Sequence, residues 1–293
     1  MFKKQIFAAI ITLSFFSTTT AQDLKFLKLK KKYRTCILDK ALEETSGLAY
    51  VDNTLISFND SGNQPYLHKI NPENGKIKTI KTNAKNYDWE AMATDEHNIY
   101  IGDFGNNRGN RKDLKIYRFP YSNDDHWTFD KVYEFQYAQQ KDFTPRNVKH
   151  NFDAEAMIYH HQNLQIFSKE WASYDTKHYE LKLNEADKQS LAPIEEYHLG
   201  YLATDATYRN GKLYIIGYTK KAEVFLTVFT ESQPNRFFEL KPEKYYLGMS
   251  FKLGQIEGIT ATENGLYISG ERFKTRISDV KQPLYFLPYD KLK

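Results

Sequence analysis

The chain has 293 residues, of which 41% are hydrophobic and 27% are charged, a balance typical of a folded soluble protein rather than a disordered one. A formal net charge of +4 is too small to indicate nucleic-acid binding. The single cysteine, Cys36, excludes an intramolecular disulfide and argues against a cysteine-based zinc site.

The start of the chain has the composition of an export signal. Lysines precede a mostly apolar run at residues 6–16, which is too short to cross a bilayer. Small residues at 19–21 are typical of a signal-peptidase site, so we expect residues 1–21 to be removed by cleavage between Ala21 and Gln22. We therefore expect an exported protein, periplasmic or secreted, with no membrane span in its mature chain.

From residue 44 onward, one short pattern recurs five times: two variable residues, an acid, a small residue and an apolar residue. The acid position is occupied in turn by Ser46, which replaces the acid, and by Glu90, Glu155, Asp205 and Glu257. A polar turn follows each copy, and a second strand begins 9, 9, 9, 8 and 9 residues after that position. Such a repeat is typical of the blades of a β-propeller, which run roughly 40 to 50 residues.

The remaining strands complete the blades. Third strands are predicted at residues 65–70, 114–119, 178–183, 224–229 and 283–288, and fourth strands at 76–81, 131–137, 195–199 and, loosely, 236–246. The fifth copy has no fourth strand of its own, so we expect residues 33–38 to pair with it and close the ring. The sequence therefore predicts one all-β domain over residues 22–293, a β-propeller of five four-stranded blades. Six blades are the alternative, if a loop around 120–150 or 230–250 hides a degenerate one.

The acids of the repeat should meet at one end of the central channel, because the first strand of each blade lines that channel. We expect Glu90, Glu155, Asp205 and Glu257 to form a ring with Ser46. Glu44, Asp88 and Asp153 lie two positions before members of this ring and point the same way, so up to seven carboxylates are expected at this end. Two carboxylates about 4 Å apart repel each other by roughly 4 kcal/mol at an effective dielectric near 20. A bound cation such as Ca²⁺ or Mg²⁺, basic partners, or protonation would relieve this repulsion, and the residues do not decide among the three.

The loops between second and third strands reach the same mouth, where binding residues tend to concentrate. Candidate ligand-binding residues in these loops are Asn59, Asp60, Asp103, Asn106, Asn107, Arg108, Lys169, Glu271 and Arg272. Asn, Asp and Gly also form turns without any ligand, so turn formation is the alternative. Trp89 and Trp171 either stack on a flat ligand here or pack between blades. His160 and His161 are expected to be exposed turn residues rather than metal ligands, because adjacent strand residues face opposite ways.

Four segments together resemble a group of exported bacterial β-propeller proteins of unassigned activity: Asn59-Asp-Ser-Gly, Asp88-Trp-Glu-Ala-Met-Ala, Gly102-Asp-Phe-Gly-Asn-Asn-Arg and Lys115-Ile-Tyr-Arg-Phe-Pro. More loosely, the repeated start of each blade is similar to that of the gluconolactonase-like and esterase-like phytase propellers. The second resemblance implies a divalent metal near the axis, with Glu90, Glu155, Asp205 and Glu257 as its ligands by position. Those enzymes have six blades, whereas the repeat gives five here.

These observations favour an exported propeller that binds a ligand at the acidic mouth of its channel, with Ca²⁺ or another divalent cation as the candidate cofactor. One alternative is a metal-assisted hydrolase of a lactone, ester or sugar derivative, with Glu90 or Glu155 as general base. The other is a protein-binding scaffold. The partner would be a small molecule, a glycan or an envelope protein, and we expect a monomer that binds no nucleic acid.

Overall fold

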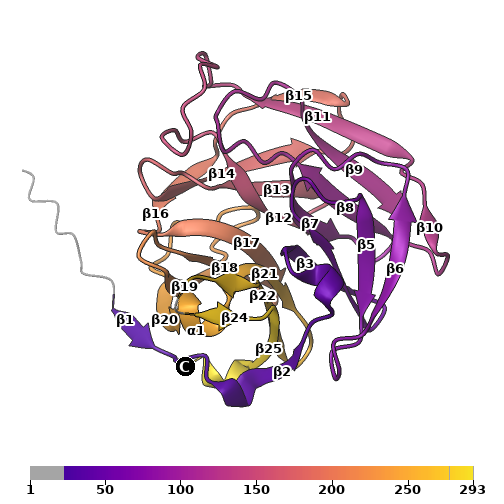
Figure 1. Cartoon of the computed structure of the whole chain (residues 1–293). Helices are drawn as coiled ribbons and strands as arrows, with labels where there is room; N and C mark the ends of the chain where they lie inside the picture. The colour runs from indigo at the N-terminus through magenta and orange to yellow at the C-terminus, as the bar shows by residue number, and fades with distance from the viewer. Residues whose placement is uncertain (1–22, 277, 293) are drawn as a thin grey trace, which may run out of the picture.

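The computed structural model describes residues 23–276 and 278–292, and the predicted export signal lies outside these residues. The described chain forms five sheets of four or five mostly antiparallel strands, arranged as the blades of a propeller, which confirms the predicted fold (Figure 1). The innermost strands contact one another in the cyclic order β3, β7, β12, β17 and β21. Among the described residues, none of the helices is long and apolar enough to cross a membrane.

The first three blades follow the predicted repeat, with strands numbered outward from the channel. Blade 1 contains β3 (Thr45–Val51), β4 (Thr54–Asn59), β5 (Tyr66–Ile70) and β6 (Ile77–Thr82). Blade 2 contains β7 (Trp89–Thr94), β8 (Asn98–Asp103), β9 (Leu114–Pro120) and β11 (Lys131–Tyr137). Blade 3 contains β12 (Ala154–His160), β13 (Asn163–Ser168), β14 (Asp175–Lys182) and β16 (Glu195–His198).

The last two blades close the ring. Blade 4 contains β17 (Leu202–Arg209), β18 (Lys212–Tyr218), β19 (Glu223–Thr230) and β20 (Glu243–Met249). Blade 5 contains β21 (Gln255–Ala261), β22 (Gly265–Glu271), β25 (Pro283–Pro288) and, from the N-terminal segment, β2 (Arg34–Ile37). Because β2 pairs antiparallel with β25, the predicted closure of the ring by the N-terminal strand is confirmed.

Short strands from long loops extend three of the blades instead of building a sixth. They pair in parallel with the outer strands of blades 1, 2 and 4 and are β10 (His126–Trp127), β15 (Lys188–Leu191) and β1 (Leu24–Phe26). The six-bladed alternative is therefore wrong, since the loops at 120–150 and 230–250 only extend or complete blades that already exist. These additions also cover sheet edges that would otherwise be exposed.

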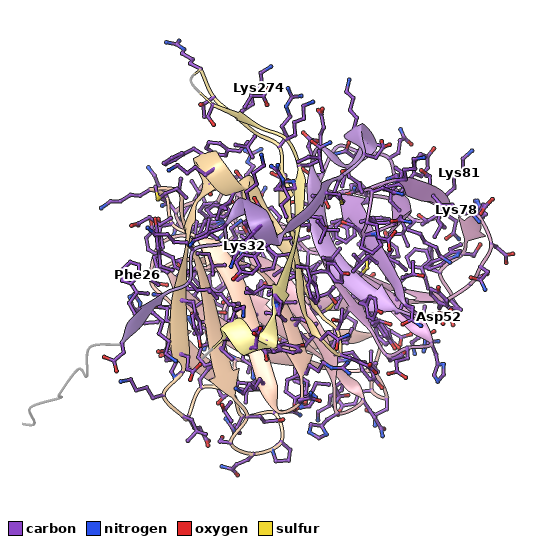
Figure 2. The ribbon with its side chains drawn as sticks, turned by 90° about the horizontal axis from the view of Figure 1, so that it is seen from below. Phe26, Lys32, Asp52, Lys78, Lys81 and Lys274 are labelled. Carbon is purple, nitrogen blue, oxygen red and sulfur yellow. The ribbon has the colours of Figure 1, made fainter. Side chains whose placement is uncertain are left out.

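Helices are short and lie at the ends of strands. They are η1 (Lys31–Tyr33), η2 (Lys40–Leu42), α1 (Ser250–Leu253) and η3 (Tyr289–Lys291). Between β22 and β25 a small hairpin forms from β23 (Phe273–Lys274) and β24 (Asp279–Val280). Figure 2 shows this hairpin, marked by Lys274, projecting from one end of the propeller, while Asp52 of the β3–β4 turn lies toward the other end.

The core consists of five apolar clusters, one between each pair of neighbouring blades. Alternation along the strands explains this arrangement, because successive side chains point to opposite faces of a sheet. In β8, Ile99 and Ile101 face blade 1, while Tyr100 faces blade 3. Trp89 is fully buried and packs edge-on against Phe58, so it belongs to the core between blades and not to the mouth of the channel.

Candidate functional site

Each inner strand begins with a β-bulge, and the bulge positions the acids of the repeat. In blades 2, 3 and 5 the bulged residue is Glu90, Glu155 and Glu257, respectively. All three side chains are nearly buried, with 4%, 5% and 6% of their surface exposed. A bulge leaves its extra residue out of the ladder and redirects its side chain. Three of the four predicted ring acids therefore share one structural position at the start of the channel.

Asp205 does not share that position. The strand register places Thr204 in the bulge of blade 4, whereas Asp205 pairs regularly with Ile216. The fully buried Asp205 carboxylate accepts hydrogen bonds from the backbone N–H groups of Ala206 (2.8 Å) and Ile259 (2.7 Å). It therefore joins blade 4 to blade 5 and is directed at the backbone. Blade 1 shows the same shift, because its bulged residue is Gly47 and not Ser46, although its spacing to the second strand is 9 residues. The spacing alone therefore does not locate the bulge.

Three carboxylates form a compact group at the mouth, which we name the acidic trio: Asp60, Asp88 and Glu90. One oxygen from each lies within 4.8 Å of the others. Asp60 follows β4, Asp88 precedes β7 and Glu90 is the bulged residue of blade 2. Because Asp60 lies at the end of a blade 1 strand and the other two at the start of blade 2, the packing of these two neighbouring blades brings the three together.

Gly105, in the loop after β8, lies directly against this trio. A Cβ atom at this position would lie 2.4 Å from Glu90 Oε1 and 2.5 Å from Asp88 Oδ2, closer than any real contact. The Gly105 N–H also donates to the backbone oxygen of Asp88 (3.1 Å). The loop can therefore approach the carboxylates only because residue 105 has no side chain.

The trio carries negative charge that the surrounding protein compensates poorly. Burial, together with the charges of Asp60 and Asp153, raises the pKa of Asp88 to about 7, and Arg111 offsets this only in part. Burial and the neighbouring Glu155 raise the pKa of Glu90 well above its usual value. Within residues 23–276 and 278–292, no hydrogen-bond donor reaches the Glu90 carboxylate. The site must therefore take up either a proton or a cation at neutral pH.

On the opposite side of the mouth, the carboxylates have partners. Lys169, only 2% exposed, donates its ammonium group to Glu155 in a buried ion pair. The Lys169 Nζ atom also lies 4.7 Å from the centre of the Trp171 ring and 5.5 Å from that of Tyr218. Glu257 accepts hydrogen bonds from the Tyr218 hydroxyl (3.1 Å) and from Gln255 Nε2 (2.7 Å). Basic and hydrogen-bonding partners therefore reduce the repulsion between carboxylates in this half of the ring.

Two of the predicted loop residues stabilise the walls of the mouth. Asp103 is fully buried and pairs with Arg111 at 2.9 Å. Asn106 donates from its backbone N–H to Asp153 Oδ1 (2.6 Å) and from its side chain to the backbone oxygen of Phe152 (2.6 Å). These contacts fix the loop after β8 against the loop before β12.

Four other predicted residues point elsewhere or act through the backbone. The Asn59 side chain donates to the backbone oxygen of Ala41 (2.6 Å), while the Asn107 and Arg108 carbonyls accept backbone hydrogen bonds from residues 148 and 146. Arg272 forms ion pairs with Glu43 (3.0 Å) and Asp279 (2.9 Å). Of the nine predicted loop residues, this leaves Asp60, Lys169 and Glu271 beside the buried acids.

Glu271, at the end of β22, lies on the Lys169 side of the mouth. Burial raises its pKa to about 9, with further contributions from the negative charges of Glu257 and Asp60. Gln255 Nε2 donates to Glu271 Oε2 at 3.0 Å. With this raised pKa, Glu271 carries a proton at neutral pH that it can donate.

Sequence reasoning placed Asp88 and Asp153 at the mouth, because each lies two residues before a repeat acid and therefore on the same side of the strand. It did not include Arg111 and Tyr218 among the site residues. Trp171 stands at the mouth as expected and donates its indole N–H to Asp153 Oδ2 at 2.7 Å. Arg111 and Tyr218 lack such a pattern and are identified only by their contacts.

No known protein family and no curated protein matches the chain. Among solved structures, the chain is similar to a protein from Thermus thermophilus provisionally described as an oxidoreductase (glucose dehydrogenase), with 12% identity, a TM-score of 0.48 and coverage of 83% of this chain and 97% of that one. It is also similar to a provisionally described 6-phosphogluconolactonase from Bacteroides uniformis (10% identity, TM-score 0.43, coverage 82% and 71%).

A glycosyl hydrolase from Bacteroides ovatus is a third similar structure, with 12% identity, a TM-score of 0.47 and coverage of 89% of this chain and 94% of that one. At such low identity the three likenesses concern the path of the chain, and no functional argument rests on them.

Proposed function

We propose that the protein is an exported propeller that binds a divalent cation, Ca²⁺ in the first place, in the acidic trio at the mouth of its channel. The observation that supports this proposal is the convergence of Asp60, Asp88 and Glu90 within 4.8 Å, without a basic group in ion-pair contact with any of the three in the described chain. Ca²⁺ prefers oxygen ligands, takes six to eight of them and tolerates irregular geometry. Three carboxylates leave coordination positions for water and for a ligand.

The surroundings of the trio indicate which ligand would complete the site. Across the mouth, the partly buried Trp171 ring offers a flat apolar face, whereas the Lys169 ammonium group is buried in its pair with Glu155. A bound cation attracts anionic or hydroxyl-rich molecules, and an aromatic ring stacks on the apolar face of a sugar. We therefore assign the site to an acidic small molecule or glycan, held between the cation and Trp171.

Thermal unfolding tests the cation directly. Adding Ca²⁺ to chelator-treated protein should raise the unfolding midpoint, because a ligand at 100 times its Kd stabilises the folded state by about 2.7 kcal/mol. The variant Glu90→Gln should abolish the response. The control Glu134→Gln, at an exposed position of β11 in blade 2, should retain it. The proposal would be contradicted if neither Ca²⁺ nor chelator changed the unfolding midpoint of the unmodified protein. It would also be contradicted if Glu90→Gln responded to Ca²⁺ as the unmodified protein does.

A metal-assisted hydrolase of a lactone, ester or sugar derivative is the second candidate, and Glu271 favours it. A bound cation would supply polarisation of the substrate oxygen. Glu271, protonated at neutral pH, is placed to donate a proton to a leaving group as general acid. A panel of lactones and esters, assayed with several divalent metals, should show turnover that falls in Glu271→Gln. Absence of turnover in the unmodified protein under all these conditions would remove this candidate.

A further inference from the structure

A second cluster of metal-ligand side chains lies at the opposite face of the propeller from the acidic trio. His160 ends β12, His161 begins the turn to β13, and Glu231 directly follows β19 in the next blade. One nitrogen of each histidine and one oxygen of Glu231 lie within 4.8 Å of one another. The turn belongs to the same end of the propeller as the β3–β4 turn, whose Asp52 is marked in Figure 2.

The backbone explains why two adjacent residues converge here. The sequence predicts that the histidines face opposite ways, but His161 has φ of +46° and Gln162 has φ of +63°. These two residues form the tight turn of a hairpin, in which both central residues are left-handed. The chain reverses immediately after His160, so the two imidazole rings lie side by side with their centres 4.1 Å apart.

Glu231 is held in place by neighbours that leave its oxygen Oε1 turned to the histidines. The Tyr208 hydroxyl donates to Oε2, and the Asn235 N–H donates to Oε1 at 2.9 Å. Oε1 lies 2.8 Å from His160 Nε2 and 3.7 Å from His161 Nε2. In a tetrahedral site with metal–ligand bonds of about 2.0 to 2.1 Å, ligand atoms lie roughly 3.3 Å apart. The two observed distances lie on either side of that value.

We propose that His160, His161 and Glu231 form a binding site for a transition-metal ion such as Zn²⁺, Cu²⁺ or Ni²⁺. Imidazole nitrogen is a preferred ligand of these ions, in contrast to the oxygen-only acidic trio. The His161 side chain is 50% exposed, whereas those of His160 and Glu231 are 11% and 12% exposed. An ion from solvent would therefore reach His161 directly and meet His160 and Glu231 as a mostly buried pair. The fourth coordination position faces solvent and remains open to water or to an external ligand.

The same contacts have a simpler reading, in which Glu231 only anchors the loop of residues 231–236 through hydrogen bonds. Without an ion, His161 at 3.7 Å makes no hydrogen bond to Glu231, so its removal would cost the loop little. The two readings therefore differ in what happens when His161 is replaced.

Titration calorimetry with Zn²⁺ distinguishes them. His161→Asn should lower the Zn²⁺ affinity at least tenfold while leaving the unfolding midpoint of the metal-free protein unchanged, since asparagine accepts a positive φ. His97→Asn, a matched change in the turn between β7 and β8 on the same face, should bind Zn²⁺ like the unmodified protein. Asp88→Asn should also retain this binding, because Asp88 belongs to the other site.

Three results would overturn the proposal. They are Zn²⁺ binding no tighter than millimolar in the unmodified protein, equal affinities in the His161→Asn and His97→Asn variants, and loss of Zn²⁺ binding in Asp88→Asn but not in His161→Asn. Glu231→Gln, which keeps the shape of the side chain but weakens it as a ligand, should reproduce the effect of His161→Asn. A normal affinity in Glu231→Gln would be a fourth result against the assignment.

Discussion

Replacing Lys169 by methionine tests whether the buried acids at the mouth depend on one positive charge. Lys169 and Glu155 are 2% and 5% exposed, and their charged groups are in direct contact. Two unit charges about 4 Å apart attract each other by about 4 kcal/mol at an effective dielectric of 20. Removing one partner of a buried pair typically destabilises a protein by about 3 to 5 kcal/mol. We expect Lys169→Met to lose about that much at pH 8.

The loss should depend on pH with a defined sign. Burial raises the pKa of Glu155 well above its usual value, and Lys169 offsets that rise; without Lys169 the pKa rises further. A carboxyl group with a raised pKa in the folded state binds protons there before the unfolded chain does, so folding is favoured as pH falls. The destabilisation of Lys169→Met should therefore be largest at alkaline pH and shrink as pH falls toward about 4.5, the ordinary value of a glutamate.

Urea unfolding at pH 8 and pH 5 measures both effects, and a double variant supplies the control. Lys169→Met combined with Glu155→Leu removes both charges, and replacing a buried pair by apolar residues is often neutral. The double variant should therefore recover most of the stability that the single variant loses. The reasoning fails if Lys169→Met stays within about 1 kcal/mol of the unmodified protein at pH 8, a fraction of the expected loss, or if its loss is equal at both pH values.

Two further substitutions separate the acidic trio from the structural acids. Asp205→Asn should destabilise the fold by about 1 to 3 kcal/mol, because the buried backbone N–H groups lose a charged acceptor. The Asp205→Asn variant should respond to Ca²⁺ like the unmodified protein. Loss of that response would show that Asp205 is part of the cation site. Gly105→Ala should weaken Ca²⁺ binding at least tenfold by displacing Glu90 and Asp88. In the control Gly211→Ala the Cβ meets nothing within 4 Å, but the φ of +74° is strained for alanine, so this variant should lose some stability and keep its Ca²⁺ affinity. Equal Ca²⁺ affinities in these two variants would contradict the assigned role of the loop.

The number and order of the blades could be predicted from sequence because the repeat is local. Each blade shows an acidic or polar step, a turn and a second strand at nearly constant spacing, and these features depend on neighbouring residues alone. The pairing of residues 33–38 with the last blade was also predictable, since a ring of strands without that partner would leave an open edge.

The chemistry of the mouth was less predictable, because it depends on register and on loops. Asp205 looks like a ring acid in the sequence, but a one-residue shift of the bulge turns its side chain to the backbone. Asp60 and Asp88 meet because blades 1 and 2 pack side by side, and Gly105 permits a loop to approach them. The side-by-side placement of His160 and His161 was not predicted, since the rule of alternating side chains ends where φ becomes positive.

The most direct test of the cation site is calorimetric titration of chelator-treated protein with Ca²⁺, in parallel with the variant Asp88→Asn. We predict that the unmodified protein binds a single Ca²⁺ ion with high occupancy and that Asp88→Asn shows no binding heat over the same range. Absence of binding in the unmodified protein, or identical titrations of the two proteins, would show that the convergence of Asp60, Asp88 and Glu90 serves protonation instead of a metal.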